Sequence, residues 1–222
     1  ANENSTNVST HAGALEIVNI FSWIDDLDIR PLAVLVNSTI SNSRYPGNIH
    51  FHFFLPDGLE EEHSHHKLKA LFPRPNIVVH GHNVIREKVK SMSDDDYSTS
   101  NLAHVLAFYI PRIYQNIGRF IYLAPDVVVK DKVEDLFQVD FKSFSLAAVE
   151  DCSQNFGTYK NFEVINAIQR SGARPWVAQV PYEKNTCILD LSVLLVNADN
   201  LAKENIIETM KWWRKVLRAE GE

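Results

Sequence analysis

Several motifs that identify large enzyme classes are missing from the sequence. No glycine-rich GxGxxG and no P-loop follows an apolar segment, which disfavours dinucleotide-dependent enzymes and P-loop nucleotide hydrolases. No GxSxG is present, so the nucleophile elbow of the α/β hydrolases is absent as well. No apolar run approaches the roughly 18 residues that a membrane-spanning helix needs. A functional site in this chain must therefore be built from other patterns.

Positive charge and cysteine are also scarce. Lysine and arginine number 22 against 28 aspartates and glutamates, so the net charge is −6 and no overall basic field attracts nucleic acid or an anionic membrane. The only cysteines, Cys152 and Cys187, are by themselves compatible with two buried thiols or with a disulfide. No signal peptide is visible, so we expect any targeting segment to have been removed or to lie outside these residues.

The amino-terminal residues 1–14 are small and polar and lack apolar periodicity, which predicts a disordered tail. Asn4 and Asn7 each begin an Asn-x-Ser/Thr pattern, the acceptor for N-linked glycans. Two such patterns favour the secretory pathway, although they also arise by chance in a segment so rich in asparagine, serine and threonine. A third, at Asn37, falls in a segment expected to be helical and partly buried, so we predict no glycan there.

Six short apolar segments predict β-strands, and helical segments separate them. The strands are expected at 15–23, 49–55, 76–80, 120–123, 145–149 and 187–196. Helices are expected at 32–40, 60–71, 101–114, 131–137, 155–170 and 202–218, with a helix or loop at 84–92. Pro111 is expected to end or kink its helix. This alternation predicts an α/β protein with a mostly parallel sheet wrapped by helices.

Acidic side chains stand at the ends of four predicted strands. They are Asp25 and Asp26, Asp126, Asp151, and Asp190. Ligands of open α/β sheets bind at the carboxyl ends of the strands, and carboxylate oxygens suit a divalent cation that holds a diphosphate. Each acid taken singly can instead cap the helix that follows it. The sequence therefore predicts a ligand or metal site at one edge of the sheet and leaves the capping alternative open.

The order of these segments resembles glycosyltransferase family eight. The resemblance is carried by LAVLVNSTISNS, NIHFHFFLPDG, RFIYLAPDVVVKDKVEDLF, LAAVEDC and CILDLSVLLVN, and it covers most of the chain from Leu15 to Trp213. The chain looks most like the plant galacturonosyltransferase-like branch, because Ala148–Cys152 occurs together with Cys187 just before the last strand.

The resemblance implies a GT-A fold over residues 15–222, a UDP-sugar donor, a carbohydrate acceptor and a Mn²⁺ or Mg²⁺ ion. It also implies retention of anomeric configuration and cell-wall polysaccharide synthesis in the Golgi lumen, with another organelle as the alternative location. Asp126 is then the predicted metal contact, and Asp25, Asp26 and Asp190 are the predicted contacts of the nucleotide-sugar. The branch further implies a disulfide between Cys152 and Cys187, whose Cα atoms should then lie within 7 Å.

Several positions depart from the family pattern. Where the family has DxD, this chain has Ala124-Pro125-Asp126, and where the family has Asp-x-Asn-Tyr, it has Asp25-Asp26-Leu27-Asp28. The Tyr-x-Arg positions look like Val105-Leu106-Ala107, which carry no charge. The Asn-Ala/Thr-Gly of the last strand is replaced by Asp190-Leu191-Ser192. The chain also stops at Glu222, before the family's His-x-x-Gly-x-x-Lys-Pro-Trp, so we expect the carboxy-terminal segment to be missing. The chain therefore retains some of the family's acidic residues and lacks the arginine, histidine and lysine positions of the family pattern.

Three functions stay open, and with them the question of whether the chain is an enzyme. The preferred one is a degenerate, non-catalytic family member that acts with a protein partner, either an active transferase or a larger assembly. The alternative is an active, retaining, metal-dependent glycosyltransferase, and a weaker one is a carbohydrate-binding module. We prefer the first because transfer requires the leaving diphosphate to be neutralised by metal and cations, which is worth several kcal/mol.

Overall fold

The computed structural model describes residues 16–92, 99–159, 163, 166 and 183–219. The predicted disordered tail, with Asn4 and Asn7, lies outside these residues, as does most of the helix predicted at 155–170. The described helices include none that is long and apolar enough to cross a membrane.

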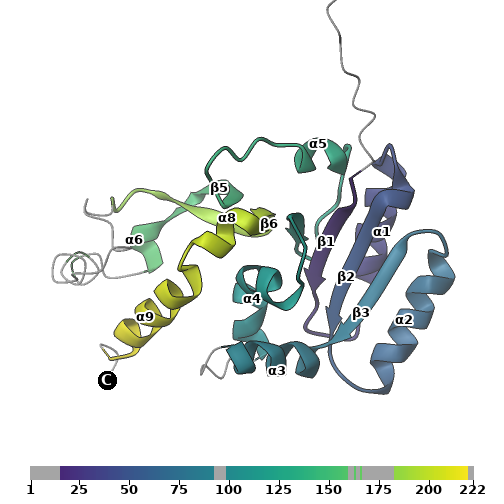
Figure 1. Cartoon of the computed structure of the whole chain (residues 1–222), viewed down its shortest axis with the longest axis horizontal. Coiled ribbons are helices and arrows are strands. Elements are labelled where there is room, and N and C mark those ends of the chain that lie inside the picture. The colour runs from purple at the N-terminus through teal and green to yellow at the C-terminus, as the bar shows by residue number, and fades with distance from the viewer. Residues whose placement is uncertain (1–15, 93–98, 160–162, 164–165, 167–182, 220–222) are drawn as a thin grey trace, which may run out of the picture.

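Six strands form one mixed sheet in the order β3-β2-β1-β4-β6-β5 (Figure 1). They are β1 (Val18–Trp23), β2 (Ile49–Leu55), β3 (Asn76–Gly81), β4 (Arg119–Leu123), β5 (Leu146–Asn155) and β6 (Cys187–Asn197). The first four are parallel, whereas β6 runs antiparallel to both β4 and β5. All six predicted strands are confirmed, and the prediction of a mostly parallel sheet holds for β1 to β4.

The strands form because their apolar side chains are buried on both faces of the sheet. Ile20 and Phe21 are consecutive in β1, so their side chains point to opposite faces, and both are fully buried. Ile20 packs in one core cluster with side chains from α1 (Arg30–Asn42) and α2 (Leu59–Leu71). Phe21 packs in a second cluster with α3 (His82–Met92) and α4 (Thr99–Ile113). The helices therefore cover the sheet in two layers, as the uninterrupted apolar runs predict.

The remaining helices follow the second half of the sheet. They are α5 (Val133–Phe137), α6 (Phe156–Tyr159), α8 (Ala198–Lys203) and α9 (Ile206–Ala219), and a short 3₁₀ turn occupies Pro46–Asn48. The single helix predicted at 202–218 is wrong, because Glu204 is extended and separates α8 from α9. Asn197 caps α8 by accepting a hydrogen bond from the N–H of Asn200. Pro111 lies inside α4, which ends only two residues later, at Ile113.

The outer parts of β5 and β6 form a two-stranded ribbon that reaches away from the parallel strands toward α6 (Figure 1). Its pairing is interrupted after Ala148 and again after Asp151. Cys152 and Cys187 form a disulfide across the ribbon, with their Cα atoms 4.6 Å apart. The predicted disulfide is therefore confirmed, and it fixes the end of β5 to the start of β6.

Candidate functional site

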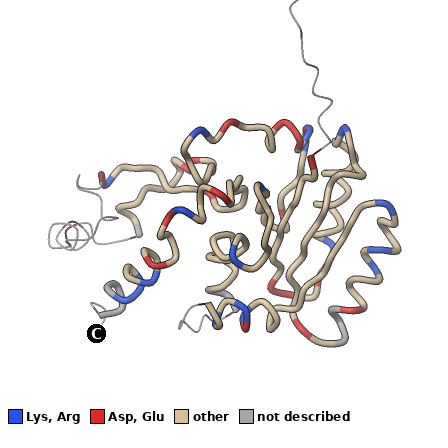
Figure 2. Tube along the Cα trace, viewed as in Figure 1, with Lys and Arg blue, Asp and Glu red and all other residues tan. Residues whose placement is uncertain are grey.

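A cleft of about 580 Å³ opens at the carboxyl ends of β1 and β4. Its lining consists of Trp23, Ile24, Asp25, Asp26, Pro31, Ala103, His104, Ala107, Tyr122, Ala124, Pro125, Asp126, Leu191, Ser192 and Leu194. In Figure 2 acidic residues mark the loop between β1 and α1 at this edge of the sheet. The cleft thus lies where ligands of open α/β sheets bind, and three of the predicted acids reach it.

The first acid, Asp25, is held by the strand that precedes it. Trp23 is buried at the end of β1 and stacks on the ring of His82, with the ring centroids 3.8 Å apart. The Nε1–H of Trp23 donates a hydrogen bond to Oδ1 of Asp25 at 2.7 Å. One carboxylate oxygen of Asp25 is therefore engaged by the fold itself, and the other remains for a ligand.

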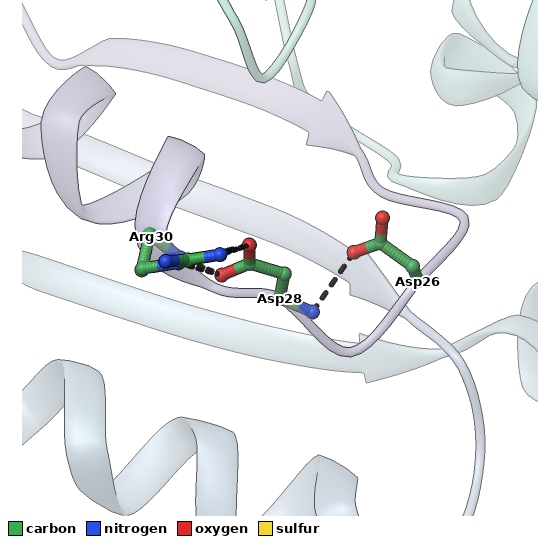
Figure 3. Close-up of polar contacts among 3 residues, drawn as sticks. All are labelled: Asp26, Asp28 and Arg30. Carbon is green, nitrogen blue, oxygen red and sulfur yellow. Dashed lines mark hydrogen bonds and ion pairs between the residues drawn. The ribbon is translucent and has the colours of Figure 1, made fainter.

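The second acid, Asp26, stabilises the turn that leads into α1 (Figure 3). Its Oδ1 accepts a hydrogen bond from the N–H of Asp28 at 2.8 Å. Asp28 in turn accepts from the guanidinium of Arg30 at 2.8 and 2.9 Å and from its backbone N–H at 3.0 Å. The side-chain hydrogen bond from Arg30 lowers the pKa of Asp28 to about 2. Arg30 is thus paired outside the cleft, because neither Arg30 nor Asp28 is among the residues that line it.

The third acid, Asp126, lies in a tight turn after β4. The N–H of Ala124 donates to the carbonyl of Ser192 at 2.8 Å, which extends the pairing of β4 with β6 by one residue. The N–H of Val127 then donates back to the carbonyl of Ala124 at 3.2 Å. Pro125 fixes the backbone at the first central position of this turn, and Asp126 is exposed at the second. The predicted break after β4 and the exposed carboxylate are both present.

The helix α4 supplies the one basic side chain of the cleft, and sequence reasoning missed it. Of the predicted Tyr-x-Arg positions Val105-Leu106-Ala107, the arginine position, Ala107, does line the cleft but carries no charge, and His104 lines it one turn earlier. Helical spacing could have identified His104 from the sequence. It lies on the side of α4 opposite the buried stripe of Leu102, Leu106 and Tyr109, and it is exposed. The carbonyl of the preceding residue, Ala103, accepts a hydrogen bond from the Tyr122 hydroxyl at 3.2 Å, which joins α4 to β4.

The two other predicted acids lie on the ribbon, outside the set of residues that line the cleft. Asp190 accepts a hydrogen bond from the N–H of Ser192 at 2.8 Å, which lowers the pKa of this carboxyl. Asp151 accepts from the N–H and the hydroxyl of Ser153 at 2.9 and 2.6 Å. Both acids therefore bind polar groups within their own strands, and neither caps a helix, while contact of Asp190 with a nucleotide-sugar stays a prediction.

The acids of the cleft do not form a ready site for the divalent ion that the family resemblance implies. Within the described residues, one set of three histidine, cysteine, aspartate or glutamate ligands brings its atoms within 4.8 Å of one another, and this set is Glu150, Cys152 and Cys187 on the ribbon. Its two sulfurs are joined in the disulfide. Asp25, Asp26 and Asp126 do not converge in this way, so the residues present do not fit an ion held by the protein alone.

Comparison with known proteins places the chain among plant sequences. It is 26% identical over 203 residues to "Probable galacturonosyltransferase-like 4" of Arabidopsis thaliana, covering 90% of this chain and 55% of that protein. It is 22% identical over 212 residues to "Probable galacturonosyltransferase-like 10" of the same plant, covering 91% of this chain and 54% of that protein. The chain thus spans about half the length of these relatives.

Solved structures share the fold at lower identity. Mouse xyloside xylosyltransferase 1 superimposes with a TM-score of 0.60 at 15% identity, covering 86% of this chain and 71% of that one. The galactosyltransferase LgtC, solved with donor and acceptor sugar analogues, superimposes with a TM-score of 0.58 at 15% identity, covering 89% and 64%. Both have the GT-A fold, so the predicted fold class is confirmed. Residues 19–221 match the family model for glycosyl transferase family 8, and the chain belongs to that family.

Proposed function

We propose that this family 8 chain no longer carries out transfer and acts as a non-catalytic subunit beside an active glycosyltransferase. The observation that supports this most directly is the charge of the cleft. Asp25, Asp26 and Asp126 face it, and His104 is the one basic side chain among its lining residues. A diphosphate bound there would meet three carboxylates with at most one protein cation to offset them.

The size of this electrostatic repulsion supports the proposal. Two like unit charges about 4 Å apart repel by roughly 4 kcal/mol at an effective dielectric constant near 20. Stabilising the departing diphosphate is usually the largest electrostatic contribution to such a reaction. Here Ala124 offers no carboxylate for a metal, and the guanidinium of Arg30 is paired with Asp28. The cleft therefore opposes the charge that develops during transfer.

The shape of the cleft adds a second obstacle. Leu191 lines it with 41% of its surface exposed, at a position where the family resemblance implies a small residue. A leucine there occupies space that the donor sugar would need. This crowding is independent of the charge argument, because neither a metal ion nor a change of pH removes it.

One observation favours the alternative, an active metal-dependent transferase that uses a UDP-sugar. Asp126 is exposed in a rigid turn at the cleft. Mg²⁺-type ions bind through only one or two carboxylates when substrate phosphates complete the coordination. Under this alternative the ion arrives together with the nucleotide and is not held beforehand.

Ligand-dependent stabilisation separates the two functions. Thermal unfolding and calorimetry with Mn²⁺ and UDP-galacturonic acid at millimolar concentration should show no change for the natural chain. A ligand at about one hundred times its dissociation constant would stabilise the fold by about 2.7 kcal/mol. Ala124→Asp restores the missing carboxylate and should gain Mn²⁺-dependent binding of UDP, which lacks the sugar that Leu191 would crowd. Val128→Asp is the matched control, since it adds the same charge at a nearby exposed position outside the cleft lining.

Stabilisation of the natural chain, with transfer of the sugar to an oligosaccharide, would establish the alternative and overturn the proposal. The subunit role has its own test, which is purification of the chain from its natural cells under mild conditions. We expect an active family 8 transferase to co-purify in stoichiometric amount, and a chain that elutes as a free monomer would contradict this role.

We also propose that the chain resides in the secretory pathway, in the Golgi lumen. The disulfide supports this location, because Cys152 is exposed and such bonds persist in oxidising compartments. Microscopy of the tagged full-length protein against Golgi and plastid markers tests it, and cytosolic fluorescence would rule it out.

A further inference from the structure

We propose that Asn37, on the outer face of α1, is a site of N-linked glycosylation. Asn37-Ser38-Thr39 satisfies the acceptor pattern Asn-x-Ser/Thr with no proline at the central position. The sequence alone predicts no glycan here, because the segment is expected to be helical and partly buried. Both properties are confirmed, but the buried side of the helix is not the side that carries Asn37.

The helix α1 has two clearly different faces. Leu32, Leu35, Val36 and Thr39 are buried against the sheet, and the Thr39 hydroxyl donates to the carbonyl of Leu35 at 2.7 Å. Arg30, Val34, Asn37 and Ser41 recur at the spacing of one helical stripe, and all four are exposed. In the described part of the chain the amide of Asn37 has no hydrogen-bond partner, so a glycan there replaces no contact.

A helix would be a poor acceptor if it formed early, but α1 depends on residues far along the chain. Its sequence is rich in β-branched residues, serine and asparagine, which favour helices weakly, and isolated helices of this length are marginal in water. Leu35 packs in a cluster with Phe141 and Leu195. The amide of Asn42 donates to the carbonyl of Val129 at 2.9 Å. The acceptor segment therefore stays available until the later strands have been made.

The reaction needs one co-reactant, an oligosaccharide joined through a diphosphate to a membrane lipid. The side-chain nitrogen of Asn37 attacks the anomeric carbon of the first sugar and forms a carbon–nitrogen bond. The bond from that carbon to the lipid diphosphate breaks, the diphosphate leaves with the bonding electrons, and the amide loses one proton. No oxidant or reductant is required. The disulfide between Cys152 and Cys187 is consistent with a chain that meets such a donor in the secretory pathway.

The glycan would leave the cleft open and would shield another surface. Pro31 lines the cleft at the start of α1, and Asn37 lies six residues further on, about 9 Å along the helix axis. The outer face of α1 would then be unavailable to a protein partner. This inference does not depend on whether the cleft is catalytic, so it can fail or hold separately from the proposed function.

The test is a peptide map of the full chain, produced behind a cleavable signal peptide in a eukaryotic secretory host. Asn4→Gln and Asn7→Gln are introduced first, so that any remaining N-glycan must be elsewhere. We expect peptide-N-glycosidase treatment to lower the apparent mass by one glycan and to convert residue 37 to aspartate. Asn37→Gln should abolish the shift. Cell-associated and secreted protein are both analysed, because transfer before folding also marks chains that fail to leave the cell.

Substitutions at Thr39 provide a matched pair that leaves Asn37 in place. Thr39→Ser and Thr39→Ala both remove a buried methyl group, but only the serine preserves the acceptor pattern. Glycan on the serine variant and none on the alanine variant is the expected result. An unmodified Asn37 peptide in both pools of the Asn4→Gln, Asn7→Gln protein would overturn the proposal.

Discussion

Protonation of two histidines packed against the sheet should make the folded protein sensitive to mild acid. His52 of β2 stacks on Phe21 with ring centroids 4.4 Å apart, and His80 of β3 stacks on His52 at 5.9 Å. Tyr114 packs against both imidazoles at 5.8 and 5.5 Å, and the ammonium of Lys88 lies 5.7 Å from the Tyr114 ring centroid. An added proton on either ring would therefore enter an aromatic environment that already contains a cation.

The pKa values give the direction and the size of the effect. Burial lowers the pKa of His52 and of His80 from 6.5 to about 4, and the nearby His50 and Lys88 contribute further to His52 and His80 respectively. At a pH between the unfolded pKa of 6.5 and the folded pKa of about 4, the unfolded chain binds more protons than the folded one. Stability is therefore complete above the unfolded pKa and falls as the pH drops toward the folded pKa. From about pH 7.5 to about pH 5 the linkage relation gives a loss of about 2 kcal/mol per histidine.

Solvent still reaches part of each ring, so we expect the pair to contribute about 2–3 kcal/mol in total rather than the full sum. Urea unfolding at the two pH values measures it. His52→Phe with His80→Phe keeps the stacked rings and removes both titrations, so the drop in unfolding free energy should shrink by that amount. His66→Gln, which removes an exposed imidazole on α2, is the control and should leave the drop unchanged. A double variant as acid-sensitive as the natural chain would refute the reasoning.

Three further changes test how the fold is held together. Replacing Cys152 and Cys187 with serine opens a link across a sequence separation of 35 and should lower the free energy of unfolding by about 3–4 kcal/mol; in urea melts, a loss below about 1 kcal/mol would contradict this. Glu134→Ala removes the acceptor of the Ser43 hydroxyl and one of the two acceptors of the Tyr45 N–H, which keeps its bond to Ser43, and should cost about 1 kcal/mol, with Glu134→Gln as the milder control. Phe53→Ala removes a fully buried ring and should cost about 3–5 kcal/mol by the same assay.

Most of the sheet could be predicted because its strands are buried on both faces. Runs such as Phe120–Leu123 leave no polar side to orient, and their start and end are almost those of β4. The outer half of β5 could not be predicted in this way. Glu150, Asp151, Ser153 and Gln154 are polar, and only the first two of them pair with β6, in a ribbon that is largely exposed, so no apolar pattern marks this half as a strand.

The sequence also predicts the presence of helices better than the positions at which they break. The sequence at 84–92 is compatible with a helix or a loop, and the segment is helical because Ile85 and Val89, one turn apart, are both buried in the core. The break between α8 and α9 depends on the extended backbone of Glu204, which is not a residue type that marks a turn. Local preference therefore predicted that a helix forms here but could not predict where it is interrupted.

The candidate site could be predicted where it depends on strand ends, and it could not be predicted where it depends on the direction of a single side chain. Asp25, Asp26 and Asp126 follow parallel strands and meet at one cleft. Because β6 runs antiparallel to β4, its beginning lies at the same edge of the sheet, and Leu191 and Ser192 line the cleft.

Asp190, which the sequence groups with these acids, lies one residue further out on the ribbon, where it accepts a hydrogen bond from the N–H of Ser192. His104 was missed because the family pattern points to Ala107, which lines the cleft one turn further along α4.

The structure also shows which positions of the donor site the fold itself depends on. At Ala124 the fold uses the backbone N–H, which pairs with Ser192, so the side chain at this position can lose a carboxylate at little cost to stability. At Asp25 the opposite holds, because the buried indole of Trp23 requires an acceptor. An acid kept at Asp25 is therefore no sign of a working donor site, and one lost at Ala124 is no sign of a weakened fold. The positions that can distinguish a transferase from a structural relative are those, like Asp126, whose side chains the fold does not use.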